Sequence, residues 1–146
     1  MKNKIILIVF LGVCSVSFGQ QTITWQDLAK VKFTEKYFPA LKETFLYPHF
    51  SVSVKSLEGK QVQLKGYFLD VDPQGKLYVL SKGPMSSCFF CGEGGPETAV
   101  EIQLASAANF KTDDVLVVTG TLYLNADDIE HFNYILKDCR AKRIDK

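Results

Sequence analysis

Two cysteines three positions apart, Cys88 and Cys91, are the residues of this chain best suited to chemistry. They are followed closely by Gly92, Gly94 and Gly95, so the backbone can turn tightly around whatever the two sulfurs hold. The spacing predicts that both sulfurs face one point. This segment is therefore the first candidate for a functional site.

A metal site is one interpretation of the pair, because two thiolates on one side of a tight turn suit tetrahedral zinc or a soft ion such as Cu(I). The motif itself supplies only two ligands. The candidates for completing the set are Glu97, His131 and Cys139. Each of the three also has an ordinary role, as a surface carboxylate, a solvated imidazole and a small half-buried side chain.

The start of the chain predicts an export signal. Lys2 and Lys4 precede an apolar run over residues 5–16, and Ser17 and Gly19 are small residues at the positions that a signal peptidase inspects. The run is about a dozen residues, shorter than the roughly 20 needed to cross a bilayer. We therefore expect cleavage after Gly19 and no transmembrane segment in the mature chain.

Lipid attachment at Cys14 is the alternative to conventional cleavage. Val13 argues against it, because the residue before a lipidated cysteine is normally small. We therefore expect a periplasmic or secreted protein rather than one anchored through Cys14. Three cysteines would remain after cleavage, an odd number in an oxidising compartment.

Export also favours a disulfide between Cys88 and Cys91, which we expect as the leading chemical state of the pair. The ring would be short and would stabilise the fold less than a long-range crosslink. Thiol-disulfide redox catalysis is the third interpretation. Active pairs lower the pKa of the first cysteine at a helix N-terminus. Here Pro96 and the glycines oppose a helix, and Glu93 adds negative charge beside the thiols.

The charge balance argues against a nucleic-acid-binding role. The formal net charge is +1, from 17 Lys and Arg against 16 Asp and Glu, and loss of Lys2 and Lys4 with the signal would make it −1. Nucleic-acid binders usually carry a basic face and a high isoelectric point. Residues 20–146 suffice for one domain, which we expect to be a monomer.

Alternation of apolar and polar residues predicts five strands, over residues 61–68, 76–81, 99–104, 115–124 and 133–138. Gly66 and Gly120 interrupt the two longest of them, where a strongly coiled strand can bend. In the third strand Val100 should face inward and Glu101 outward. Five such strands predict a small closed β-barrel, and the fifth strand would bring His131 and Cys139 toward the cysteine loop.

The segments outside these strands have less regular sequence patterns. A short helix is expected over residues 105–110, between the third and fourth strands, and an exposed basic tail over residues 140–146. Residues 20–56 are expected to form an arm that packs its aromatic side chains over the core. Thr24 would cap a short helix in it, and prolines would divide the rest into short pieces. An aromatic ligand groove is the alternative for this arm.

Three motifs connect these strands to a known pattern. They read Gly59-Lys60-x-Val62-x-Leu64-x-Gly66, Val117-x-Thr119-Gly120-x-Leu122 and Tyr134-x-Leu136-x-Asp138-Cys139. Their spacing resembles that of OB-fold domains. Over residues 57–139 the chain is similar to a family of exported OB-fold-like proteins of unknown function from Gram-negative bacteria, in which a cysteine-containing loop follows the second strand.

The resemblance implies a five-stranded OB-like barrel rather than a particular activity, because OB barrels bind oligonucleotides, sugars and peptides. A role in metal homeostasis at the cell envelope is suspected for some relatives. We expect a signal peptide over residues 1–19, an N-terminal arm over 20–56 and a barrel domain over 57–146.

The predicted function is an exported, non-enzymatic binding or accessory module of the cell envelope. Its Cys88 and Cys91 would bind a transition metal, zinc or copper, or form a structural disulfide. An envelope protein is the expected partner. The alternative is a thiol-disulfide redox protein that uses the same two cysteines.

Overall fold

The computed structural model describes residues 19–74, 76–107 and 109–144. Nearly all of the predicted signal segment, and Cys14 within it, lies outside the described residues. Within the described ranges, no helix is both long enough and apolar enough to cross a membrane.

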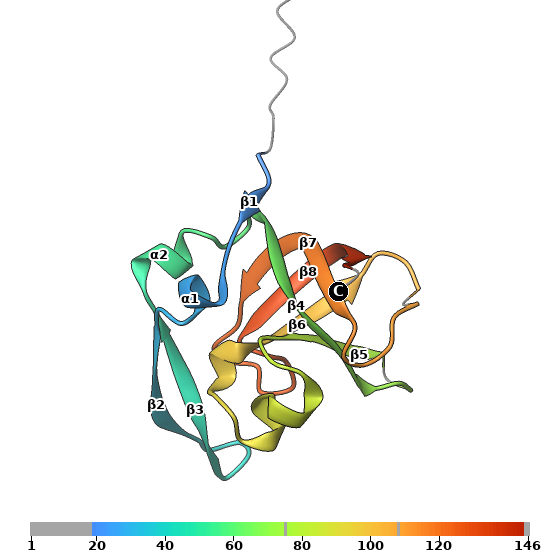
Figure 1. The fold of residues 1–146 in the computed structure, drawn as a ribbon. Coiled ribbons are helices and arrows are strands. Elements are labelled where there is room, and N and C mark those ends of the chain that lie inside the picture. Colours follow the sequence, from blue (N-terminus) through green and yellow to red (C-terminus); the bar gives the residue numbers. More distant parts are fainter. Residues whose placement is uncertain (1–18, 75, 108, 145–146) are drawn as a thin grey trace, which may run out of the picture.

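A closed barrel of five strands forms the body of the molecule (Figure 1). The strands are β4 (Gln61–Asp72), β5 (Leu77–Ser81), β6 (Ala99–Leu104), β7 (Val115–Leu124) and β8 (Tyr134–Arg143). They follow one another around the barrel in the order β4, β5, β6, β8, β7, and β4 pairs with β7 to close it. Only the pair β6 and β8 is parallel among these five pairings. The predicted small OB-like barrel is confirmed.

Alternation along β4 fills the barrel interior as predicted, with Val62, Leu64 and Phe68 buried and Lys65 exposed. At Gly66 the neighbouring atoms leave no room for a side chain. A Cβ atom there would lie 2.6 Å from the Ser81 carbonyl oxygen and 2.9 Å from Trp25 Cζ2. Only glycine therefore lets β5 and the Trp25 ring approach β4 this closely.

Strand β8 is longer than predicted and includes part of the expected basic tail. Asp138 has a φ of 54°, and the β7–β8 register shifts beside it, so that Asp138 and Cys139 both face Gly120. Two residues opposite one form a β-bulge. Beyond the bulge the strand continues to Arg143, so the first part of the expected tail belongs to β8, while Arg140, Lys142 and Arg143 are exposed as expected.

The short helix expected over residues 105–110 is not found among the described residues of that segment, which form bends and irregular chain. The Ala105 N–H donates to the Cys139 carbonyl oxygen at 3.0 Å, which extends the contact with β8. Phe110 packs against the barrel core at the other end of the segment. These two contacts attach both ends of the segment to the barrel.

The N-terminal arm begins with β1 (Gln21–Thr22), which pairs in parallel with β4. Helix α1 (Trp25–Leu28) follows, with Thr24 as its N-cap as predicted. The Asp27 carboxylate accepts the Thr24 N–H at 3.0 Å and the Thr24 hydroxyl at 2.8 Å, which closes the first turn.

A hairpin of β2 (Val31–Phe38) and β3 (Glu43–Phe50) occupies most of the arm, followed by α2 (Val52–Lys55). Pro48 lies inside β3 and pairs with Phe33, so the expected break at this proline was wrong. Proline is tolerated there because both strands of a two-stranded sheet are edge strands.

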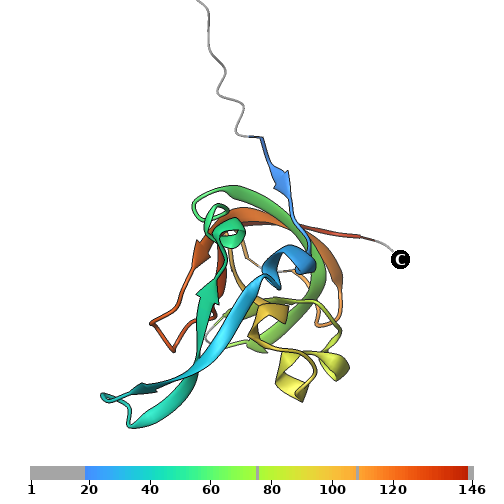
Figure 2. The same ribbon diagram turned by 90° about the vertical axis from the view of Figure 1, so that its left-hand side faces the viewer.

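The hairpin projects away from the barrel, as Figures 1 and 2 both show. Phe50 fixes the base of the hairpin, because its ring packs edge-on against that of Tyr134 with 5.5 Å between the ring centroids. The Tyr134 hydroxyl in turn donates to the Leu28 carbonyl oxygen at 2.6 Å. Farther out, Lys36 Nζ lies 3.2 Å from an Asp127 carboxylate oxygen in the β7–β8 connection. The arm is thereby attached to the barrel both at the base of the hairpin and farther along it.

Candidate functional site

The cysteine loop connects β5 to β6 through three single turns of 3₁₀ helix, Met85–Ser87, Phe89–Cys91 and Pro96–Thr98. It lies against the outer face of the barrel beside β4, β5 and β6. The outward side chains of these strands, Leu69, Val79 and Ala99, are buried together with Cys88. Because three apolar residues face outward here, the loop folds over them and removes them from water.

Both thiols of the loop converge on one atom. Cys88 Sγ donates to the Met85 carbonyl oxygen at 3.2 Å, and Cys91 Sγ donates to the same oxygen at 2.9 Å. A tight turn enforces this, because the Cys91 N–H donates to the Cys88 carbonyl at 3.0 Å and Gly92 ends the turn with a φ of 81°. Both cysteines are free thiols in the structure. The arrangement fits the expectation that the two sulfurs face one point.

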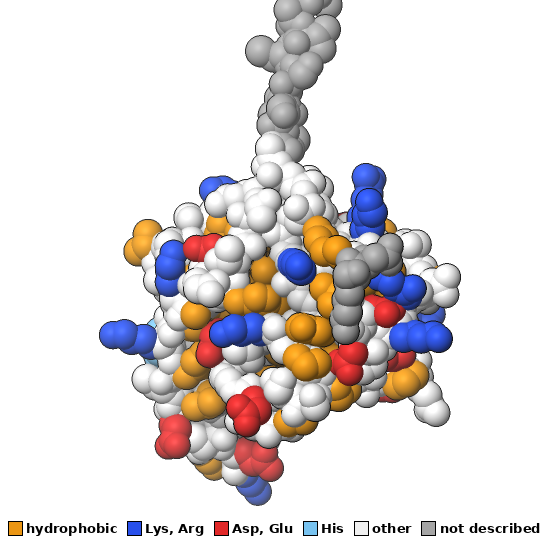
Figure 3. All heavy atoms as spheres, in the orientation of Figure 1, with side chains coloured by type: hydrophobic (Ala, Val, Ile, Leu, Met, Phe, Trp, Pro, Cys, Tyr) orange, Lys and Arg blue, Asp and Glu red, His pale blue; other side chains and the backbone are white. Residues whose placement is uncertain are grey.

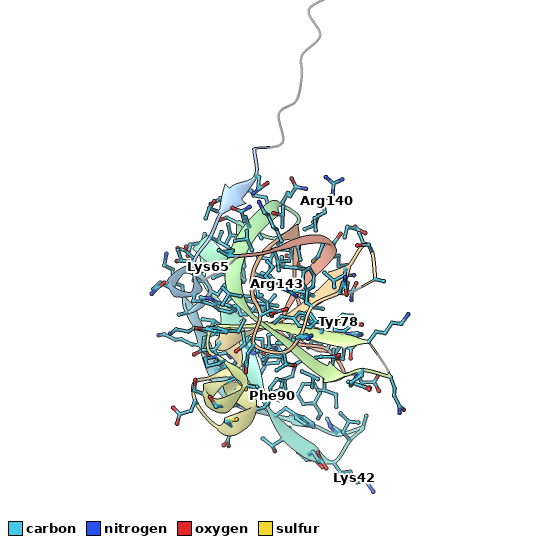
Figure 4. All side chains as sticks on the ribbon, turned by 45° about the vertical axis from the view of Figure 1, so that its right-hand side comes forward. Lys42, Lys65, Tyr78, Phe90, Arg140 and Arg143 are labelled. Atoms are coloured by element: carbon cyan, nitrogen blue, oxygen red, sulfur yellow. The ribbon has the colours of Figure 1, made fainter. Side chains whose placement is uncertain are left out.

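The two thiols differ in their access to solvent. Cys88 is only 2% exposed, whereas Cys91 lies on the surface. Phe90 between them is 45% exposed, and Figure 4 shows it on the side of the loop toward the β2–β3 hairpin. Its ring packs against that of Phe132 in the β7–β8 connection, with 5.9 Å between the ring centroids. The site is thus closed by the barrel on the Cys88 side and open on the Cys91 side.

Met85 is a residue of this site that sequence reasoning missed. Its backbone N–H donates to an Asp113 carboxylate oxygen at 2.7 Å, which ties the loop to the β6–β7 connection. Its thioether Sδ lies 3.9 Å from Cys88 Sγ. The regular spacing Met-x-x-Cys-x-x-Cys was the available signal, because residues three apart in successive tight turns return to the same side.

Cys139, a candidate for completing a metal site, lies in the barrel core and not at the loop. Its Sγ donates to the Leu136 carbonyl oxygen at 3.1 Å and would lie 2.8 Å from a Cβ on Gly120. Burial raises the pKa of this thiol to about 12. Cys139 therefore fills space at the β-bulge.

Glu97 is half-buried in the last turn of the loop. Its charge lies near Tyr134, where it adds to the effect of burial in raising the pKa of the phenol. The Gly95 backbone packs closely against the Glu97 carboxylate, which leaves this side chain beside its own turn. Glu97 thus lies beside its own turn and close enough to Tyr134 to affect it.

His131 is paired with a buried carboxylate. Its Nδ1 lies 3.0 Å from both carboxylate oxygens of Glu101, and the Phe132 N–H donates to one of them at 3.3 Å. The hydrogen bond to Glu101 and the charge of that carboxylate raise the pKa of His131. Glu101 lies on the outer face of β6, as expected, but is only 4% exposed because the β7–β8 connection covers that face.

The structure brings Cys88 and Cys91 together and engages Glu97, His131 and Cys139 elsewhere. Among residues 19–74, 76–107 and 109–144, no three His, Cys, Asp or Glu side chains form a group that could hold a metal ion. A third ligand for the cysteine pair, if it comes from this part of the chain, has to be of another type.

A groove of about 480 Å³ adjoins the loop, between the β2–β3 hairpin and the β7–β8 connection. His131 lines it together with Asp128 and Glu130. Its apolar lining includes Phe38, Phe45, Leu46, Phe89, Ile129 and Phe132. Phe89 belongs to the cysteine loop, so the loop that carries the thiol pair also forms one side of the groove. In the view of Figure 3 apolar side chains are exposed among charges of both signs.

No protein-family model matches the chain, and no curated protein matches it significantly. Its function therefore has to be inferred from its own geometry.

Proposed function

We propose that the chain is an exported, non-enzymatic binding module of the cell envelope, and that its loop binds one transition-metal ion through Cys88 and Cys91. The observation that carries this proposal is the convergence of both thiols on the Met85 carbonyl oxygen, at 3.2 and 2.9 Å. Thiols bind metals after losing their protons, so two thiols aimed at one point are arranged to share one ion.

The geometry favours metal binding over redox catalysis. In a catalytic pair the first cysteine is an accessible thiolate at the N-terminus of a helix. Here the first cysteine, Cys88, is buried in an apolar cluster, and a single 3₁₀ turn that ends at Gly92 follows it. A disulfide remains the competing state of the same pair, since the two sulfurs are close in the chain.

Export is proposed from the signal pattern at the start of the chain, with Lys2 and Lys4 before an apolar run. In an oxidising compartment a bound metal protects two neighbouring thiols from forming a disulfide. A protein partner in the envelope is supported by the apolar groove beside the loop and by the exposed ring of Phe90.

The test is intact mass and metal analysis of the protein isolated without reductant from the periplasm. We expect about one zinc or copper ion per chain, and loss of that ion in Cys88→Ser. Cys139→Ala is the matched control, because this thiol lies in the barrel core, and it should keep the metal.

Two results would overturn the proposal. A chain that is lighter by two hydrogens and free of metal would show that the pair is a disulfide. A metal-free chain with two reactive thiols and disulfide-reductase activity would show a redox enzyme.

A further inference from the structure

A third sulfur lies beside the cysteine pair. Met85 Sδ is 3.9 Å from Cys88 Sγ, and the carbonyl oxygen of the same residue accepts both thiol hydrogen bonds. Met85 is half-buried and packs against the cluster that holds Cys88. Three sulfur atoms from one short segment are therefore gathered on one side of the loop.

The kinds of donor in this group discriminate between metals. Thiolate and thioether ligands select soft ions such as Cu(I). Zinc sites are instead four-coordinate and take their ligands from Cys, His, Asp and Glu. Within the described part of the chain, none of those residue types joins the two cysteines in a group that could hold a metal.

We propose that the loop is a three-sulfur site for Cu(I), with the thiolates of Cys88 and Cys91 and the thioether of Met85 as ligands. This inference rests on the metal-binding function proposed above and adds the third ligand and the identity of the ion. Binding is a ligand exchange without a redox step. One Cu(I) enters and two thiol protons leave to solvent, so that two S–H bonds break and two Cu–thiolate bonds form. A third Cu–S bond forms to the Met85 thioether, which loses no proton, and the two thiol hydrogen bonds to the Met85 carbonyl oxygen are lost.

The backbone around Met85 is already fixed before a metal arrives. The Met85 N–H is held at 2.7 Å by the Asp113 carboxylate, and the Ser87 N–H donates to the Pro84 carbonyl at 2.9 Å. The Met85 side chain can rotate toward the thiols readily because methionine is unbranched. The loop is thus close to a metal-binding arrangement in its free state.

The test is anaerobic titration of the reduced chain with Cu(I) against a chromogenic Cu(I) chelator, for the wild type and for Met85→Leu. This substitution keeps the side-chain volume and removes the thioether. Loss of an outer-shell partner alone weakens metal binding about 10-fold or more, so loss of this ligand should weaken Cu(I) binding at least about 10-fold. Zinc binding by the thiol pair should change little.

Selenomethionine labelling provides a second readout on the unmutated side chain. Met1 is the only other methionine of the chain, so selenium at a bonding distance from copper in X-ray absorption identifies Met85 as a ligand.

Stoichiometric Cu(I) binding with no copper–selenium contact, and unchanged affinity in Met85→Leu, would overturn the third ligand and leave the metal-binding function standing. Failure of the reduced wild type to bind Cu(I) while it binds zinc would overturn the choice of copper. Failure to bind either ion would overturn the proposed function itself.

Discussion

His131 Nδ1 lies 3.0 Å from both carboxylate oxygens of Glu101. Glu101 is buried on the outer face of β6, and its other donors are the Phe132 N–H at 3.3 Å and Gln103 Nε2 at 3.1 Å. A buried carboxylate is stable only when donors surround it. The pair therefore fastens the β7–β8 connection to the barrel and fixes one wall of the groove.

The His131–Glu101 pair should make stability depend on pH. Its hydrogen bond and the charge of Glu101 raise the pKa of His131 above 6.5 in the folded chain. Protonated His131 is thus favoured by folding, and its contribution is fully present below pH 6.5 and is lost as the pH rises through the raised pKa. Because the side chain is 45% exposed, we expect less than about 1 kcal/mol.

Urea unfolding of the wild type and of His131→Gln at pH 6 and pH 8 measures this contribution. The free energy of unfolding should fall more for the wild type than for the variant between these two pH values. Subtracting the variant's change in the free energy of unfolding from that of the wild type removes the contribution of His49, which is present in both chains. An equal or smaller fall in the wild type would contradict the ion pair.

Gly66→Ala should destabilise the barrel. The added methyl group would meet the Ser81 carbonyl oxygen at 2.6 Å and Leu80 Cγ and Trp25 Cζ2 at 2.9 Å, so β4 and its neighbours have to separate. Overpacking of this kind costs about 1–3 kcal/mol. Chemical denaturation measures the loss.

Lys65→Ala is the matched control, because Lys65 is the exposed neighbour of Gly66 in the same strand. It should change the free energy of unfolding by less than about 0.5 kcal/mol. If both variants had the same small effect, the close approach of β5 and α1 to β4 would not exist in solution.

Cys88, Cys91 and Cys139 should react with iodoacetamide in a fixed order in the reduced, metal-free chain. Cys91 is exposed and should react first, and the buried Cys88 should follow slowly. Cys139 should react only on unfolding, because it is buried in the core and its pKa is raised to about 12. Peptide mapping after timed quenching gives the order, and rapid labelling of Cys139 would contradict its place in the core.

Most of the barrel could be predicted because its strands follow simple physical patterns. Val62, Leu64 and Phe68 alternate with polar residues along β4, and Gly66 marks the bend. The β2–β3 hairpin was missed because most of its side chains are exposed on both faces, so no period-two pattern of burial marks it. The end of β8 was missed because the positive φ of Asp138 interrupts the alternation at a bulge.

The candidate site was predicted in part for a similar reason. Cys88 and Cys91 are three positions apart in sequence, and a local turn is enough to bring them together. The positions of His131 and Cys139 depend on tertiary contacts, with Glu101 and with Gly120, that spacing alone does not reveal. Met85 was missed because methionine is usually a core residue, and its role is suggested only by its distance to Cys88.

Native mass spectrometry of the reduced chain after addition of one equivalent of Cu(I) tests the metal-binding pair most directly. We predict a species that has gained one copper ion and lost two protons. Cys139→Ala should give the same species, and the double variant Cys88→Ser, Cys91→Ser should remain metal-free. A wild-type chain that stays metal-free, or a double variant that still binds copper, would contradict the claim that Cys88 and Cys91 together hold one metal ion.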